Sequence, residues 1–197
     1  MEKLVAIAIV VLMLLVAARY SWLICTDKNT SPVLATWILF LAASFLSFWT
    51  YWNTREHSLI GNMTNFSDLI AVTVILGSIL IARGKESRLG FTKFQFFCLI
   101  ASGIILILWK LGNFSPKTSN MLLQTIMTIA YFPTLGKLWS AKNNPEPIEV
   151  WSGVMIVSSL GLGLSISENN IPGIVYAGRS LFFSSIIVAL IARIAWR

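Results

Sequence analysis

Long runs of apolar residues, separated by short polar connectors, dominate the pattern along this chain. A helix needs about 20 such residues to cross the ~30 Å hydrocarbon core of a bilayer. The runs do not alternate between apolar and polar positions, which argues against the strands of a membrane barrel. We therefore predict an all-α integral membrane protein with seven transmembrane helices, at Leu4–Ile24, Val33–Trp52, Asn65–Ala82, Lys93–Trp109, Ser119–Trp139, Val150–Ile166 and Ile171–Ile191.

The composition agrees with lipid as the main solvent. Of the 197 residues, 56% are hydrophobic and only 12% are charged, which is too apolar for a water-soluble domain of this size. The connectors are too short to form a separate domain. The first run, which follows Lys3 and ends near Val16-Ala17-Ala18, also resembles a cleavable signal peptide. We retain it as a helix because the repeat described below requires it.

The residues expected of a catalytic centre are missing from the sequence. The single histidine, His57, lies in a connector, and the chain has no HExxH or GxSxG motif. Cys25 and Cys98 lie near helix ends without CxxC spacing, which is typical of small hydrophobic residues. We therefore expect no enzyme activity, no cofactor and no metal site.

The Lys and Arg residues are distributed unequally between the two ends of the predicted helices. One end holds Lys3, Arg55, Lys110 and Lys117. The other end holds Arg19, Lys28, Arg83, Lys85, Arg88, Lys93, Lys137, Lys142, Arg193 and Arg197. The positive-inside rule places the second end in the cytoplasm, with the N-terminus outside and the C-terminus inside. The net charge of +7 thus reflects orientation, and we expect lipid and a small solute as partners, not nucleic acid. A homo-oligomer is left open.

The first and last thirds of the chain resemble each other. Lys28-Asn29 and Lys142-Asn143 lie 114 residues apart, as do Trp37 and Trp151, and Ser44 and Ser158. The tetrapeptide Leu-Ile-Ala-Arg ends the third run at residues 80–83 and recurs at residues 190–193. These matches predict three helices (residues 1–83), a linker helix (84–116) and three further helices (117–197). A single linker helix makes the two bundles parallel in the membrane.

The segment Tyr131-Phe132-Pro133-Thr134, followed by Lys137, Lys142-Asn143 and Trp151, resembles the PQ-loop family, which includes the SWEET sugar transporters, cystinosin and the KDEL receptor. The glutamine of the family motif is replaced by Thr134, and the aligned pair in the first unit is Arg19-Tyr20. The resemblance implies a seven-helix fold with a central solute path. A similarity to small bacterial membrane proteins implies a bacterial plasma membrane. Pro133 bends its helix and serves either as a gate hinge or as a fixed packing kink.

Two charged residues stand out at membrane depth, away from the span ends, where charge is costly and usually functional. Asp68 precedes Arg83 by 15 residues and Arg179 precedes Arg193 by 14, so both lie about 20 Å from the cytoplasmic helix ends. In SWEET-like proteins the equivalent helices present a polar residue to the substrate. We expect Asp68 and Arg179 to form an ion pair or to bind the two ends of a zwitterionic or anionic solute. The alternative is that both side chains reach the outer headgroups.

We predict a site for a small polar solute, sugar-like or zwitterionic, transported by alternating access between the two bundles. Its predicted residues are Trp52, Asn65, Asp68, Tyr176 and Arg179. An aromatic face beside polar donors suits such a solute, although tryptophans at span ends also form the interfacial belt. The alternatives are a non-transporting receptor and a structural membrane protein without a solute site.

Overall fold

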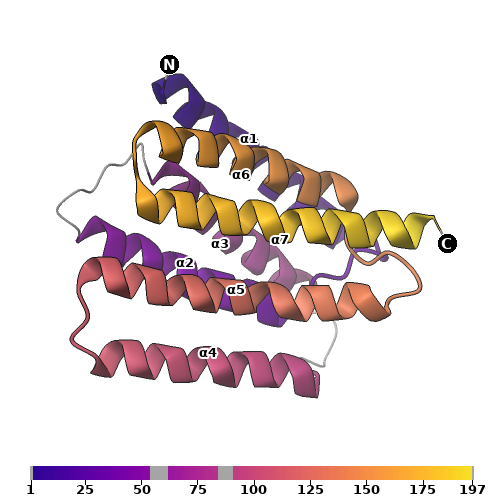
Figure 1. The fold of residues 1–197 in the computed structure, drawn as a ribbon. Helices are drawn as coiled ribbons and strands as arrows, with labels where there is room; N and C mark the ends of the chain where they lie inside the picture. The colour runs from indigo at the N-terminus through magenta and orange to yellow at the C-terminus, as the bar shows by residue number, and fades with distance from the viewer. Residues whose placement is uncertain (1, 54–61, 84–90, 197) are drawn as a thin grey trace.

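The computed structural model describes residues 2–53, 62–83 and 91–196. In these ranges the chain forms seven α-helices that alternate in direction, so the two termini lie at opposite ends (Figure 1). The helices are α1 (Glu2–Thr26), α2 (Leu34–Trp52), α3 (Met63–Arg83), α4 (Lys93–Leu111), α5 (Pro116–Ser140), α6 (Ile148–Ser167) and α7 (Ile171–Ala195). Each of the seven predicted runs therefore forms a helix, and no predicted end differs from the observed end by more than four residues.

Short polar signals start several of these helices. The Thr92 hydroxyl accepts a hydrogen bond from the Gln95 amide while the Gln95 side chain accepts one from the Thr92 amide, a capping box that starts α4. Ser115 caps α5 just before Pro116, and Asn170 caps α7, whose first turn contains Pro172. These caps satisfy amide groups that the first helical turn leaves without partners.

Six of the seven helices, all except α5, are long and apolar enough to cross a bilayer. Their surface carries large apolar side chains, among them Leu4, Phe45, Ile81, Phe97 and Phe182, each more than half exposed. Such a surface is stable in lipid and unstable in water. The chain is therefore a helical membrane protein.

Helix α5 is less apolar because its first half carries polar side chains. Among these, Asn120 and Gln124 are buried. Helix α5 packs against α2, α4 and α7, and its Asn120 and Gln124 side chains donate hydrogen bonds to Ser47 of α2. Seven spans were predicted, and by composition the fifth is the exception.

The helices pack in a definite order. Helix α3 contacts both α1 and α2, and α7 contacts both α5 and α6. Between these two groups, α1 packs against α6 and α2 packs against α5. Helix α4 lies at the edge, beside α5 and α2 (Figure 1). The core therefore forms where the first three helices meet the last three.

Small residues allow close contact between the two groups of helices. A side chain at Gly161 of α6 would overlap the Thr64 side chain of α3, and one at Gly153 would overlap Val16 of α1. Glycine at these positions thus permits α6 to approach both α1 and α3, as is common between membrane helices.

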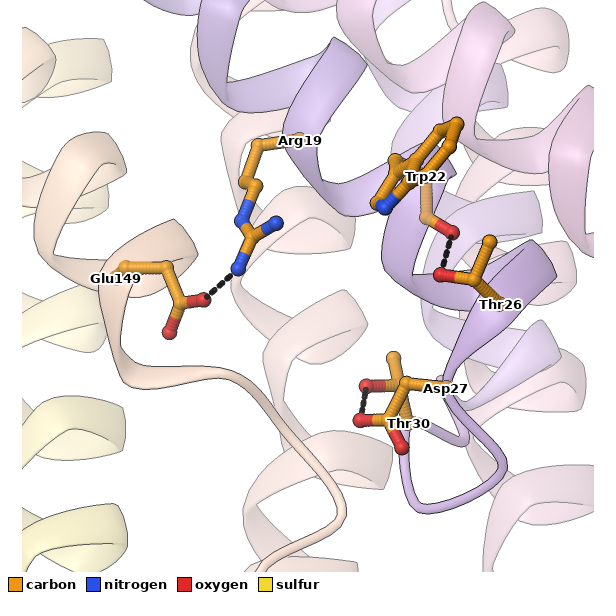
Figure 2. A network of polar contacts seen from close by, with 6 residues as sticks. All are labelled: Arg19, Trp22, Thr26, Asp27, Thr30 and Glu149. Carbon is orange, nitrogen blue, oxygen red and sulfur yellow. Dashed lines mark hydrogen bonds and ion pairs between the residues drawn. The ribbon is translucent and has the colours of Figure 1, made fainter.

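The end of α1 and the start of α6 are joined by polar contacts. Figure 2 shows Arg19 of α1 directed toward Glu149 of α6, with Nη2 and Oε1 separated by 3.0 Å. Beyond α1, Asp27 accepts hydrogen bonds from the Asn29 amide and the Thr30 hydroxyl, which shape the turn into α2. These hydrogen bonds, chiefly the one from the Asn29 amide, lower the pKa of Asp27 below its ordinary value because they stabilise the carboxylate.

Candidate functional site

Asp68 of α3 and Arg179 of α7 lie on either side of Tyr176 of α7. The Tyr176 hydroxyl donates a hydrogen bond of 2.7 Å to Asp68 Oδ2. The guanidinium carbon of Arg179 lies 5.0 Å from the centre of the Tyr176 ring. The three side chains thus form one group in which both charges contact the same tyrosine.

The two charges do not form the direct ion pair that was one of our expectations. Within the described part of the chain the one ion pair joins Arg19 and Glu149. The physical reason is that Asp68 is bound through the Tyr176 hydroxyl, while Arg179 lies against the Tyr176 ring. The second expectation, that the two charges bind opposite ends of a solute, stays a prediction.

The Arg179 guanidinium is held mainly by aromatic rings. Its carbon also lies 5.8 Å from the centre of the Tyr131 ring of α5. Cation–π contact stabilises the charge through the ring faces and leaves the N–H groups without acceptors. Accordingly, Nε and Nη1 of Arg179 are buried and donate no hydrogen bond to any described residue. Buried donors without acceptors are rare and costly, so this guanidinium is suited to bind an oxygen-rich group.

Tyr131 and two serines complete this part of the site. The Tyr131 hydroxyl donates to Ser180 Oγ at 3.3 Å, and Ser158 Oγ of α6 donates to the same oxygen at 2.8 Å. The Tyr131 ring packs edge-on against Phe40 of α2. The site thus contains side chains from both three-helix groups. Our sequence prediction omitted Tyr131, Ser158 and Ser180 because hydroxyl groups are frequent in membrane helices and carry no strong signal.

A second polar layer lies one helical turn away, around Ser47 of α2. The side-chain amides of Asn65, Asn120 and Gln124 all donate to Ser47 Oγ, at 3.3, 3.0 and 3.2 Å. Asn65 precedes Asp68 by three residues on α3, so the two layers are about 4.5 Å apart along the helix. Asn65 was predicted, whereas Asn120 and Gln124 were not, although their spacing of four residues places them on one face. Two of the side-chain carbonyl oxygens in this layer lack a donor. Asn65 Oδ1 and Gln124 Oε1 accept no hydrogen bond from described residues.

Ser47→Ala should lower stability because it removes the acceptor shared by three buried amides. We expect a loss of about 1–3 kcal/mol, because the Asn65 amide loses its acceptor, whereas Asn120 keeps the Ser47 carbonyl and Gln124 keeps Asn120 Oδ1. The matched control is Ser102→Ala in α4, whose buried hydroxyl has no hydrogen-bond partner among the described residues. That change should be neutral or stabilising. Thermal unfolding in detergent measures both variants, and equal effects would contradict the shared-acceptor role of Ser47.

The remaining predicted residues lie away from these charges. Trp52 is 46% exposed at the end of α2, where its ring stacks on Phe48. Pro133 lies inside α5, two residues after Tyr131, and the helix continues through it. The next residue, Thr134, forms a hydroxyl–hydroxyl hydrogen bond of 2.9 Å with Thr36 of α2. Pro133 thus lies between the Arg179 site and the connectors that follow α1 and α5, and its role as a hinge stays a prediction.

Comparisons of the chain with models of protein families, with curated proteins and with solved structures find no match. The function is therefore inferred from the side chains of the site.

Proposed function

We propose that this chain is a membrane transporter or facilitator for a small polar solute, which binds beside Asp68, Tyr176 and Arg179. The observation that carries the proposal is the Arg179 guanidinium, whose Nε and Nη1 are buried without an acceptor among the described residues. Charged groups inside membrane helices are rare and commonly mark solute or ion pathways. The contribution of residues from α3, α5, α6 and α7 further supports a binding role.

The site suits two related kinds of solute. A zwitterionic solute has a carboxylate for Arg179 and an ammonium group for Asp68. A sugar-like solute has hydroxyl groups that accept from Arg179 and donate to Asp68, with the tyrosine rings against its apolar face. Both kinds use the two charges together, in agreement with the sequence-based prediction.

The helix contacts support a duplicated three-plus-one-plus-three architecture. If α1, α2 and α3 correspond to α5, α6 and α7, then the contacts of α3 with α1 and α2 correspond to those of α7 with α5 and α6. The contact of α1 with α6 corresponds likewise to that of α5 with α2. A parallel pair of bundles of this kind underlies alternating access in transporters. This symmetry, with the motif around Pro133, also supports the proposed likeness to the PQ-loop family.

The proposed orientation, with the N-terminus outside a bacterial plasma membrane, has a natural reporter. Cys25, near the end of α1, is exposed, whereas Cys98 is buried. Of the cations on which the orientation depends, Arg55, Lys85, Arg88 and Arg197 lie outside the described residues. A membrane-impermeant maleimide should label Cys25 only after the cells are permeabilised, with Cys25→Ser as the control. Labelling of intact cells would contradict the orientation.

Uptake into proteoliposomes tests the proposed function. The purified protein is reconstituted and offered a panel of radiolabelled sugars, zwitterionic amino acids and organic anions. We expect saturable uptake of at least one member and none in protein-free liposomes. Binding of a panel member without uptake, seen as a shift in melting temperature, would support the receptor alternative. Neither binding nor uptake across the panel would favour a structural protein.

A further inference from the structure

Glu146 is a buried carboxyl group that the proposed solute site does not use. It lies in the connector between α5 and α6, and its side chain is 1% exposed. The Tyr20 hydroxyl of α1 and the Trp151 indole of α6 both donate to its Oε2, the indole at 3.1 Å. The other oxygen, Oε1, is buried and accepts no hydrogen bond from any described residue. A carboxylate in this position is thus incompletely solvated.

Two other titratable groups act on Glu146. Tyr20 faces it from α1, and the Lys137 ammonium acts on it from α5. Burial raises the pKa of Glu146 above its ordinary value, while the hydrogen bonds from Tyr20 and Trp151 and the charge of Lys137 offset part of this increase. The Arg19–Glu149 pair is exposed, so water screens its effect. Burial therefore makes the protonated form of Glu146 more stable, relative to the carboxylate, than it is in water.

Glu146 also lies where the two halves of the molecule meet. The Ser31 amide, in the connector after α1, donates to the Pro145 carbonyl at 3.0 Å. The Lys137 ammonium donates to the backbone oxygen and the hydroxyl of Ser31. Separation of the two halves at this end must break the contact between Tyr20 and Glu146 and expose the carboxyl group to water.

We propose that Glu146 is a proton-binding site that controls this end of the bundle. The protonated acid holds the two halves together, whereas the ionised carboxylate favours their separation because an ion gains hydration when it is exposed. Closure and proton binding are therefore linked, and each strengthens the other. The pH dependence of transport that follows from this linkage rests on the proposed function, but the linkage itself does not.

The first test measures stability against pH. Since the folded protein binds this proton more tightly than the unfolded chain, the stabilising effect is complete below the ordinary Glu pKa. It is lost as the pH rises through the raised pKa. Glu146→Gln keeps an acceptor for Tyr20 and Trp151 but cannot ionise. Its melting temperature should therefore lack this decline and equal or exceed that of the wild type at neutral pH.

The matched control is Glu149→Gln, three residues further along the chain, where the side chain is 47% exposed. This variant should keep the pH dependence of the wild type. If Glu146→Gln also keeps it, or melts below the wild type at neutral pH, the carboxylate stabilises the fold in its ionised form and the proposal fails.

The second test measures opening directly. Ala35, near the start of α2, is fully buried. In protein carrying Cys25→Ser and Cys98→Ala, an Ala35→Cys thiol should react with a water-soluble maleimide faster at high pH than at low pH. The rate at the exposed Cys25 of the Cys98→Ala protein is measured as the reference. It corrects for the intrinsic rise of thiol reactivity with pH. The corrected rate should change by up to about tenfold for each unit by which the pKa is raised.

Adding Glu146→Gln should keep labelling slow at every pH, and equal rates with and without this change would overturn the proposal. Uptake assays separate the two proposals. Labelling that depends on Glu146 without uptake would refute the transport function alone. Uptake together with labelling that does not depend on Glu146 would refute the proton site alone.

Discussion

Arg179→Gln is expected to abolish solute uptake by reconstituted protein. The change removes the guanidinium charge that lies against both the Tyr131 and the Tyr176 rings and reduces the donors available to an oxygen-rich solute. Loss of one partner of a buried charged contact costs at least about 2 kcal/mol, equivalent to roughly 30-fold in affinity. We expect a decrease of this size or larger in the uptake rate at low solute concentration.

Two companion variants make this result specific. Arg179→Lys keeps the charge but loses the planar set of donors, so it should retain part of the activity if charge matters and little if geometry matters. Lys110→Gln removes an exposed cation at the end of α4 and should leave uptake unchanged. Uptake by Arg179→Gln at the wild-type rate, with the protein correctly folded, would remove Arg179 from the site.

The second large effect concerns the bond between Asp68 and Tyr176. Tyr176→Phe removes the hydroxyl that binds Asp68 but keeps the ring against Arg179. Hydrogen bonds to charged groups contribute about 1.5–3 kcal/mol, so Tyr176→Phe and Asp68→Ala should each lower stability by an amount of this order. Because both variants break the same bond, the double variant should be little worse than either single one.

Thermal or denaturant unfolding in detergent measures this cycle. We expect a coupling energy of about 1–2 kcal/mol between the two positions. Thr73→Val is the control on the same helix, because the Thr73 hydroxyl donates to the Leu69 carbonyl within α3 and, among the described residues, to no other group. Combined with Tyr176→Phe, it should give additive effects. A coupling energy near zero for Asp68 and Tyr176 would mean that their contact does not organise the site.

The sequence contained most of the information on the helices and part of that on the site. Apolar runs and caps determine where a membrane helix begins and ends, which explains why all seven helices were predicted. Equal depth placed Asp68 and Arg179 at one level, and the structure brings them to the same tyrosine. Depth alone does not define which way a side chain points around its helix. Trp52 was therefore included in the predicted site, and Tyr131 was omitted.

The role of Glu146 was not predictable from the pattern. A glutamate in a connector is normally exposed, and nothing near it in the sequence indicates burial. Its burial arises because the connector lies against Tyr20, which is 126 residues away in the sequence. Contacts of this separation depend on how the helices assemble. Sequence spacing within one helix does not report them.

The polar character of α5 has a consequence for biogenesis. A helix that carries buried Asn120 and Gln124 enters lipid reluctantly, because both side-chain amides donate to Ser47 of α2, an acceptor that they lack before α2 and α5 pack together. The preceding α4 is strongly apolar, exposes most of its surface and is connected to α5 by only a few residues. We therefore expect the insertion machinery to release α4 and α5 into the membrane together, as a helical hairpin. Helix α2, which carries Ser47, precedes α5 in the chain. It is therefore already synthesised when α5 needs this acceptor.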